Sequence, residues 1–203
     1  MFEWINIELT SRCNKACHFC GRAKARAENA LTGEDMPMET FEKIISQYRG
    51  TAVQFNKDGE PLLYPAIGEV GRKCRNYITN IITNGALLWD RREDLLGFTT
   101  ITVSVFEDDT KQFENIKRFV EYTKAPRLCV KYLGDYENKE FDALGLTTLR
   151  RTIHSGDVDK DYLGGKPPIP EFGICLDFLF KPSISCRGDF SICNRYDPSN
   201  KGI

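Results

Sequence analysis

Short apolar runs typical of β-strands alternate with amphipathic, helix-like segments along most of this 203-residue chain. Six runs rich in β-branched and aromatic residues predict strands at residues 2–9, 51–55, 77–83, 100–106, 127–133 and 149–153. Apolar residues at helical spacing predict helices between them, at 38–49, 65–76, 87–96, 110–123 and 139–144. The alternation predicts βαβ units, and therefore an α/β fold with a parallel sheet. In parallel barrels, the loops at the carboxyl ends of the strands carry the chemistry.

Charge and cysteine content narrow the class of protein further. The 28 Lys and Arg residues nearly balance the 29 Asp and Glu residues, so electrostatics favours neither nucleic acid nor a membrane surface as partner. No apolar run approaches the roughly 20 residues of a membrane span. Eight cysteines without a secretory signal predict a reducing cytoplasm and metal ligation rather than a disulfide framework.

Three of these cysteines, Cys13, Cys17 and Cys20, directly follow the first predicted strand with the spacing C-x3-C-x2-C. Three thiolates within eight residues can wrap one face of a cubane iron–sulfur cluster and leave one iron without a protein ligand. A cluster with all four cysteines typically transfers electrons, whereas an open iron can bind a substrate or cofactor. A zinc site is the alternative, with His18 as a fourth ligand, although structural zinc usually takes two close ligand pairs.

This cysteine run resembles the cluster motif of the radical S-adenosylmethionine (radical SAM) enzymes, C-x3-C-x-aromatic-C, with Phe19 at the aromatic position. The resemblance implies a [4Fe-4S] cluster on Cys13, Cys17 and Cys20, with S-adenosylmethionine bound to the fourth iron and Phe19 beside the cofactor. It also implies one-electron cleavage of the cofactor to methionine and a 5′-deoxyadenosyl radical. The implied fold is a partial, TIM-like (β/α)6 barrel.

The run Gly59-Glu60-Pro61 after the second predicted strand resembles the G-G-E-P motif of the same family. Glycine lets a backbone approach a ligand closely. The resemblance implies that carbonyls of this run and the glutamate accept hydrogen bonds from the ammonium group of the cofactor. Asp58 stands where the family usually has its first glycine. From the residues alone, an ordinary turn before a helix is the alternative.

Two further positions follow the next strands. Thr83-Asn84-Gly85 is a turn signal, and the resemblance implies that Thr83 and Asn84 lie in the cofactor pocket. Ser104 shares one strand face with Thr102, by alternation. The resemblance implies that Ser104 contacts the ribose or the methionine carboxylate.

The C-terminal cysteines carry a second signal. Cys175, Gly188 and Cys193 follow the pattern C-x12-G-x4-C, which resembles the opening of the SPASM and Twitch extensions and implies an auxiliary iron–sulfur cluster. Cys186 is either a third ligand or a spare thiol. We therefore divide the chain into a barrel at 1–163 and a linker with a cysteine hairpin at 164–203. Such extensions continue past this hairpin, so the chain is expected to be a fragment.

The resemblance implies an enzyme that abstracts a hydrogen atom from its substrate, either to modify a peptide or protein or to oxidise a small molecule. Its partners would be that substrate and a reductant such as flavodoxin or ferredoxin. One alternative is a non-catalytic iron–sulfur protein for electron transfer or regulation. Another is a tRNA-modifying radical SAM enzyme, against which the near-neutral charge weighs, because phosphate binding needs a basic patch.

Overall fold

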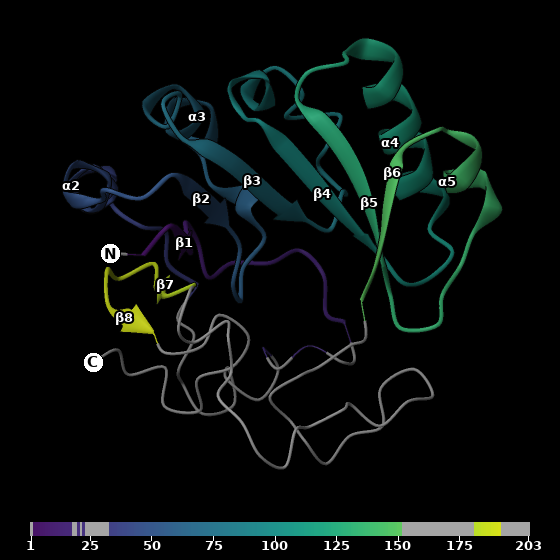
Figure 1. The fold of residues 1–203 in the computed structure, drawn as a ribbon. Helices are drawn as coiled ribbons and strands as arrows, with labels where there is room; N and C mark the ends of the chain where they lie inside the picture. The colour runs from purple at the N-terminus through teal and green to yellow at the C-terminus, as the bar shows by residue number, and fades with distance from the viewer. Residues whose placement is uncertain (1, 18–19, 21, 23–32, 152–180, 192–203) are drawn as a thin grey trace.

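The computed structural model describes residues 2–17, 20, 22, 33–151 and 181–191. In these residues, one eight-stranded sheet has the order β6-β5-β4-β3-β2-β1-β7-β8 (Figure 1). The strands are β1 (Trp4–Ile7), β2 (Ala52–Phe55), β3 (Ile78–Thr83), β4 (Thr100–Val105), β5 (Arg127–Leu133), β6 (Thr147–Arg151), β7 (Ser183–Ile184) and β8 (Phe190–Ser191). All neighbours pair in parallel except β7 and β8. The predicted α/β class is therefore confirmed.

The helices cover one face of this sheet (Figure 1). They are α2 (Met38–Gln47), α3 (Ile67–Lys73), α4 (Thr110–Tyr122) and α5 (Lys139–Ala143), with 3-10 turns η1 (Pro61–Leu63) and η2 (Asp94–Gly97). Helix α4 begins where the Asp109 side chain accepts the backbone N–H of Gln112, which satisfies one free donor of the first turn. Because each helix joins two parallel strands, the loops after the strands gather at one end of the sheet.

One predicted helix, at 87–96, is wrong. This segment forms turns that end in η2. Its buried residues Leu88 and Leu95 are seven apart, a spacing that two helical turns also produce, so periodicity could not separate the two structures. Arg91 donates to the backbone carbonyls of Tyr64 and Pro65, which ties the segment to the chain ahead of α3. Strand β6 also begins two residues earlier than predicted.

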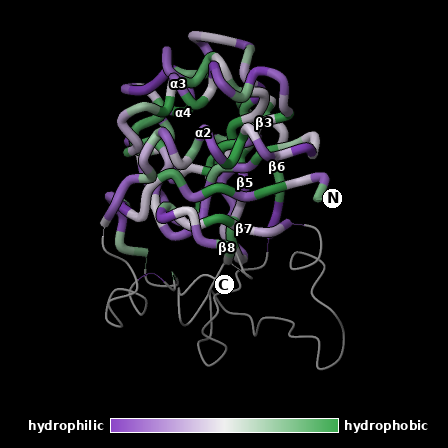
Figure 2. Tube along the Cα trace, turned by 90° about the vertical axis from the view of Figure 1, so that its left-hand side faces the viewer, coloured by the Kyte–Doolittle hydropathy of each residue, from purple (hydrophilic) through white to green (hydrophobic). Residues whose placement is uncertain are grey.

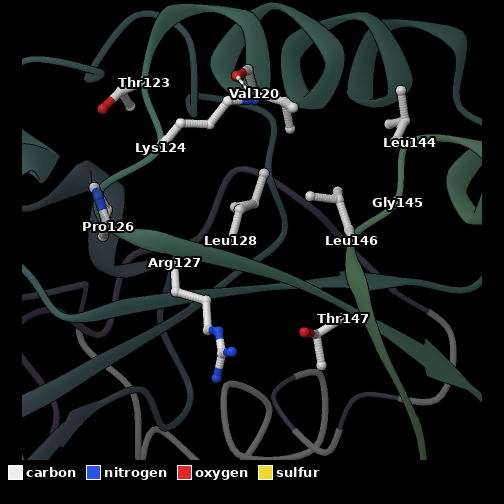
Figure 3. Close-up of a pocket in the computed structure, with 10 residues that line it drawn as sticks. All are labelled: Val120, Thr123, Lys124, Pro126, Arg127, Leu128, Leu144, Gly145, Leu146 and Thr147. Atoms are coloured by element: carbon white, nitrogen blue, oxygen red, sulfur yellow. Dashed lines mark hydrogen bonds between the residues drawn. The ribbon is translucent and has the colours of Figure 1, made fainter.

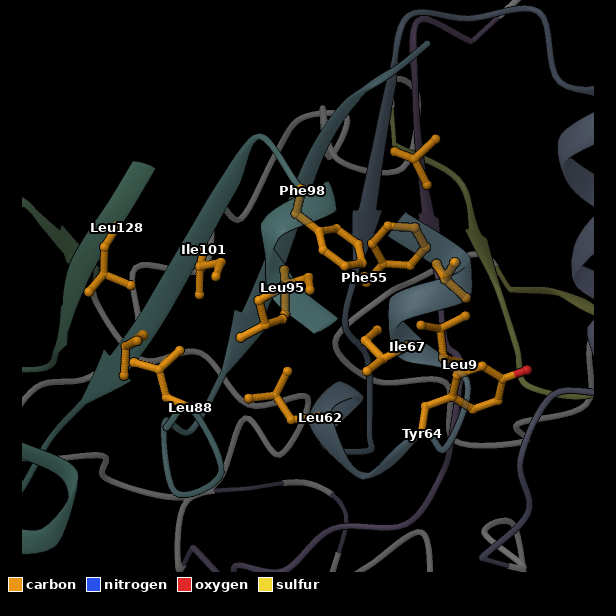
Figure 4. Packing of buried hydrophobic residues seen from close by; sticks show 14 of the residues in the cluster. Leu9, Phe55, Leu62, Tyr64, Ile67, Leu88, Leu95, Phe98, Ile101 and Leu128 are labelled. Atoms are coloured by element: carbon orange, nitrogen blue, oxygen red, sulfur yellow. The ribbon is translucent and has the colours of Figure 1, made fainter. Parts of the chain in front are cut away.

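The hydrophobic core lies between the sheet and the helices (Figure 4). Phe55 of β2 meets Phe98 edge to face, with ring centroids 5.7 Å apart. Ile67 of α3 and Leu95 of η2 are fully buried around them. Hydrophobic stretches follow the strands through the middle of the molecule (Figure 2). Burial of these side chains fixes the strands, and with them the loops that carry the site.

The other face of the sheet is polar and bonded across strands. The Asn6 amide donates to Ser183 Oγ over 3.1 Å, and Gln54 Nε2 donates to Asn6 Oδ1 over 3.4 Å. Asn80 Nδ2 donates to Gln54 Oε1 over 3.3 Å, and Thr102 Oγ1 donates to Asn80 Oδ1 over 3.0 Å. This ladder crosses β7, β1, β2, β3 and β4. The face without helices therefore keeps a hydrogen-bonding lining, which suits the interior of a half-open barrel.

The predicted C-terminal hairpin is present in the part that the structure describes. Gly188 turns the chain between β7 and β8 at a φ of +90°, a conformation that favours glycine. Strand β7 then adds to the sheet beside β1, in parallel. The predicted boundary at 163/164 falls outside the described residues. None of the helices in the described part is long and apolar enough to cross a lipid bilayer.

Candidate functional site

The cysteine segment follows β1 at the carboxyl end of the sheet, as predicted. Cys13, Cys17 and Cys20 are half-buried, and the Cys20 N–H donates to the Cys17 carbonyl over 3.0 Å. Burial, and then the charges of the other two thiols, raise the pKa of Cys17 to about 11. Burial also raises the pKa of Cys20. Phe19 lies outside the described residues.

This donor set fits an iron–sulfur cluster. Thiols whose pKa is raised, as at Cys17 and Cys20, gain from a cationic group that binds them as thiolates. In a cubane each thiolate binds a different iron, and three such ligands leave the fourth iron open. In the described segments, no three His, Cys, Asp or Glu side chains could together hold a single metal ion.

Gly59 packs its backbone against the segment that leads into Cys13. A Cβ atom at Gly59 would lie 1.8 Å from the Thr10 carbonyl oxygen and 2.9 Å from that of Arg12. The next residue, Glu60, donates its N–H to the Arg12 carbonyl over 2.7 Å. The loop after β2 therefore supports the base of the cysteine segment, and only glycine permits this approach.

The Glu60 carboxylate is engaged within the protein. It accepts hydrogen bonds from Thr83 Oγ1 over 2.6 Å, from the Asn84 N–H over 2.8 Å and from the Leu62 N–H over 3.0 Å. Glu60 is 3% exposed, and burial raises its pKa despite these donors. The side chain thus joins the loop after β2 to the end of β3. Pro61 is buried at the start of η1.

Replacing Glu60 with glutamine is expected to lower the free energy of unfolding by about 1–3 kcal/mol. An amide has a single acceptor oxygen, so its NH2 group must face one of the three donors around it. Urea denaturation measures the change. Glu69→Gln on α3, where the carboxylate is half-exposed, is the matched control and should stay within about 0.5 kcal/mol of the parent. Equal effects from both changes would contradict this role of Glu60.

Asn84 brings the end of β3 to the cysteine segment. Its amide nitrogen donates to Asn14 Oδ1 over 2.8 Å and lies 4.0 Å from Cys13 Sγ. The Gln112 amide donates to the carbonyls of both Asn84, over 2.6 Å, and Ser104, over 3.0 Å. The structure therefore brings Asn84 next to Cys13. The half-buried Ser104 is linked to Asn84 only indirectly, because Gln112 of α4 donates to the carbonyls of both residues.

Lys15 and Asp109 complete this edge of the site, and the sequence analysis did not identify them as site residues. Lys15 Nζ lies 2.9 Å from Asp109 Oδ2, 3.7 Å from Glu107 Oε1 and 5.6 Å from the centre of the Phe106 ring. Burial alone would raise the pKa of Asp109, but the hydrogen bond and charge of Lys15 lower it. These residues, with Cys17, line a cavity of about 370 Å³. An aspartate directly before a helix is typical of an N-cap, which is what Asp109 forms, but no local pattern indicates its pairing with Lys15.

A buried carboxylate joins the cysteine hairpin to this end of the sheet. Glu8 Oε1 accepts the Asp58 N–H and Glu8 Oε2 accepts the Cys186 N–H, each over 3.1 Å. Glu8 is 1% exposed, and burial followed by the charge of Asp58 raises its pKa. Burial raises the pKa of the Cys186 thiol to about 12. The structure thus brings Cys186 to the end of β1. Cys175 and Cys193 lie outside the described residues.

Glu8→Ala is expected to expose the Cys186 thiol. The substitution leaves two buried N–H groups without an acceptor, which favours release of the hairpin from β1. Alkylation by iodoacetamide, followed for the Cys186 peptide by mass spectrometry, should become at least tenfold faster, because a thiol with a raised pKa and little exposure reacts slowly. Glu3→Ala, at an exposed position before the same strand, should leave the rate unchanged. An unchanged rate in Glu8→Ala would show that other contacts hold the hairpin.

A second cavity, of about 360 Å³, lies at the other end of the sheet (Figure 3). Val120 of α4, Leu128 of β5, Leu144 and Leu146 point toward one another there (Figure 3). Among the described residues that line it, none is a cysteine, histidine or carboxylate. The cysteine triplet lies at the opposite end, after β1.

The chain is similar to known proteins in sequence and in fold. No family model matches the chain. The tungsten-containing aldehyde ferredoxin oxidoreductase cofactor-modifying protein of Pyrococcus furiosus is 27% identical over 163 residues. That match takes in 67% of this chain and 45% of the relative, so the chain spans just under half of the relative's length.

Two solved structures are similar over nearly the whole chain. SuiB of Streptococcus suis, bound to the precursor peptide SuiA, has a TM-score of 0.66 at 15% identity and covers 99% of this chain and 61% of its own. BtrN, in complex with AdoMet and 2-DOIA, has a TM-score of 0.57 at 18% identity and covers 96% of this chain and 74% of its own. Both are radical SAM enzymes. The fold is therefore that of the radical SAM partial barrel, as the sequence resemblance implied.

Proposed function

We propose that this chain is a radical SAM enzyme that acts on a peptide or protein side chain. One observation carries the proposal. The cysteine triplet follows β1 with Gly59 packed against its base, at the strand ends where Asn84 and Lys15 also gather. These residues gather around a cysteine triplet that would leave one iron of a cluster without a protein ligand, and this arrangement supports an enzyme rather than an electron carrier. The similarity to SuiB, which is bound to a precursor peptide, favours a peptide substrate.

The residues have separate roles in this proposal. Cys13, Cys17 and Cys20 would hold a [4Fe-4S] cluster, and Asn84 would donate toward the Cys13 sulfur. Carbonyls of the 58–61 loop would accept hydrogen bonds from the cofactor's ammonium group, while the Glu60 carboxylate keeps that loop attached to the end of β3. The Lys15–Asp109 pair would fix the cysteine segment against α4. When bound and reduced, the cluster with S-adenosylmethionine supplies a radical that abstracts hydrogen from the substrate.

The C-terminal segment extends the proposal. We assign residues 1–163 to the barrel and 164–203 to a linker and an auxiliary cluster hairpin, with Cys175, Cys193 and Cys186 as its candidate ligands. An auxiliary cluster would exchange electrons with the substrate or with a reductant such as flavodoxin or ferredoxin. A reducing cytoplasm suits such clusters.

Anaerobic reconstitution with iron and sulfide tests the proposal. The expected product binds about four irons at the first triplet and has the broad visible absorption of a [4Fe-4S] cluster. Addition of S-adenosylmethionine should change the electron paramagnetic resonance spectrum of the reduced cluster, because an open iron gains new ligands. A spectrum that does not change when S-adenosylmethionine is added would favour an electron carrier. Zinc in place of iron would contradict the proposal outright.

A further inference from the structure

One buried side chain, that of Glu8, is hydrogen-bonded to two separate segments at the carboxyl end of the sheet. Glu8 follows β1 and is 1% exposed. Its Oε1 accepts the Asp58 N–H, in the loop after β2, and its Oε2 accepts the Cys186 N–H, in the β7–β8 hairpin, each over 3.1 Å. Burial of a carboxylate is tolerated when its oxygens are hydrogen-bonded. The burial of Glu8 therefore depends on both segments at once.

The β7–β8 hairpin, residues 183–191, joins the sheet through a short pairing. Strand β7 pairs with β1 at two positions, Asn6 with Ser183 and Ile7 with Ile184. The Glu8 backbone N–H adds a bond to the Ile184 carbonyl over 2.9 Å. Short pairings of this kind open more readily than a long central strand. The side-chain bond of Glu8 is therefore a substantial part of what keeps the hairpin on the sheet.

The 58–61 loop is the part of the candidate site that Glu8 reaches. At the start of this loop the Asp58 N–H is bonded to Glu8, and at its end the Glu60 carboxylate is bonded to Thr83. Between them, Gly59 packs against the Thr10 backbone. The position of the first residue of the loop therefore depends on Glu8, and through Glu8 on the hairpin.

We propose that Glu8 couples the β7–β8 hairpin to the 58–61 loop, so that docking of the hairpin on β1 strengthens the binding of S-adenosylmethionine at that loop. The inference rests on the proposed function, because it takes the loop carbonyls as acceptors for the cofactor's ammonium group. With the hairpin docked, the Cys186 N–H fixes one oxygen of Glu8 and keeps the other on the Asp58 N–H. With the hairpin released, water reaches the carboxylate and the loop loses this restraint. By linkage, bound S-adenosylmethionine favours the docked hairpin to the same extent.

Amide hydrogen exchange in the full chain without iron, followed by nuclear magnetic resonance, tests the coupling. Gly188→Ala loosens the hairpin at its turn, because the φ of Gly188 is +90° and a Cβ atom would lie 3.0 Å from Thr40 Cγ2. We expect the Cys186 and Asp58 amides to exchange about tenfold faster, as the loss of one hydrogen bond to a charged group allows. Amides of the central strand β4, which report global unfolding, should be unchanged.

Two further variants make the test specific. Gly145→Ala is the matched control, because Gly145 also has a positive φ, +65°, but a Cβ atom there would meet nothing within 4 Å and the turn leads into β6. It should leave exchange at Asp58 unchanged. Glu8→Gln removes the coupling, because an amide has one acceptor oxygen and cannot accept both N–H groups. In that background Gly188→Ala should change exchange at Asp58 by less than about twofold.

Should Gly188→Ala leave the Cys186 amide protected, Ile184→Pro takes its place, because proline removes a backbone donor from β7. Faster exchange at Cys186 with unchanged exchange at Asp58 would overturn the inference. The same effect of the hairpin variant with and without the Glu8 carboxylate would overturn it too. Equal acceleration in β4 would show general destabilisation instead of coupling.

Equilibrium dialysis of S-adenosylmethionine against the reconstituted chain tests the consequence for the site. The hairpin variant should bind the cofactor about tenfold more weakly than the parent, and Glu8→Gln should abolish this difference between hairpin variant and parent. Unchanged affinity in the hairpin variant would overturn the inference while leaving the proposed function intact. A parent chain that binds no S-adenosylmethionine would refute the proposed function, and with it the effect on the cofactor, whatever the exchange rates show.

Discussion

Gly59→Ala is expected to abolish cluster assembly and to destabilise the fold by about 3 kcal/mol. The added methyl group would lie 1.8 Å from the Thr10 carbonyl oxygen and 2.7 Å from the Thr10 carbonyl carbon. Both are backbone atoms, so no side chain can rotate away to make room. Either the 58–61 loop or the segment ahead of Cys13 must move, and the hydrogen bond from Glu60 to Arg12 then breaks. Urea denaturation and bound iron measure the two effects.

Gly97→Ala provides the matched control, since a Cβ atom there would meet its nearest neighbour, the Gly71 carbonyl carbon, at 3.2 Å. This contact is tight but lies at the opposite end of α3 from the site. We expect a smaller loss of stability and unchanged iron. Normal iron binding in Gly59→Ala would contradict the role of this loop as the support of the cysteine segment.

Cys17→Ala is expected to remove about four irons per chain, because a cubane held by two cysteines is not retained. Cys17 is half-buried and lines the cavity with Lys15 and Asp109, whereas the described cysteines outside the triplet are buried. Iron and sulfide analysis after anaerobic reconstitution measures the loss. The visible absorption of the cluster should fall with it.

Cys74→Ala separates ligand loss from general damage. Cys74 is fully buried at the end of α3, and burial raises the pKa of its thiol to about 12, as expected for a small apolar core residue. This variant should lose about 1 kcal/mol of stability and keep its iron. Iron that survives in Cys17→Ala but disappears in Cys74→Ala would reverse our assignment of the ligands.

The sequence predicts the sheet well because each strand is a short apolar run between turns. The six predicted strands all form, and the cysteine segment, the Gly59 loop and Asn84 follow the first three of them. The conformation of residues 87–96 was harder to predict, because their apolar spacing is typical of a helix. In the structure, the hydrogen bonds of Arg91 hold this segment in turns. Those contacts come from residues 26 and 27 positions away, which no local pattern reveals.

Charged partners of the site were the least predictable. In β1 and just after it, Ile5, Ile7 and Leu9 alternate with Asn6 and Glu8, a pattern typical of a strand with one apolar and one polar face. Their partners did not follow, because Glu8 binds the N–H of Cys186, 178 residues away. Lys57 and Asp58 directly precede the Gly59-Glu60-Pro61 run, for which an ordinary turn was the alternative, and only the structure shows that their side chains are buried.

The central claim is tested most directly by assaying 5′-deoxyadenosine after anaerobic reduction of the reconstituted chain with S-adenosylmethionine. The account predicts this product from the parent chain and none from Cys17→Ala under the same conditions. A parent chain that carries a reduced [4Fe-4S] cluster, binds S-adenosylmethionine and forms no 5′-deoxyadenosine would contradict it.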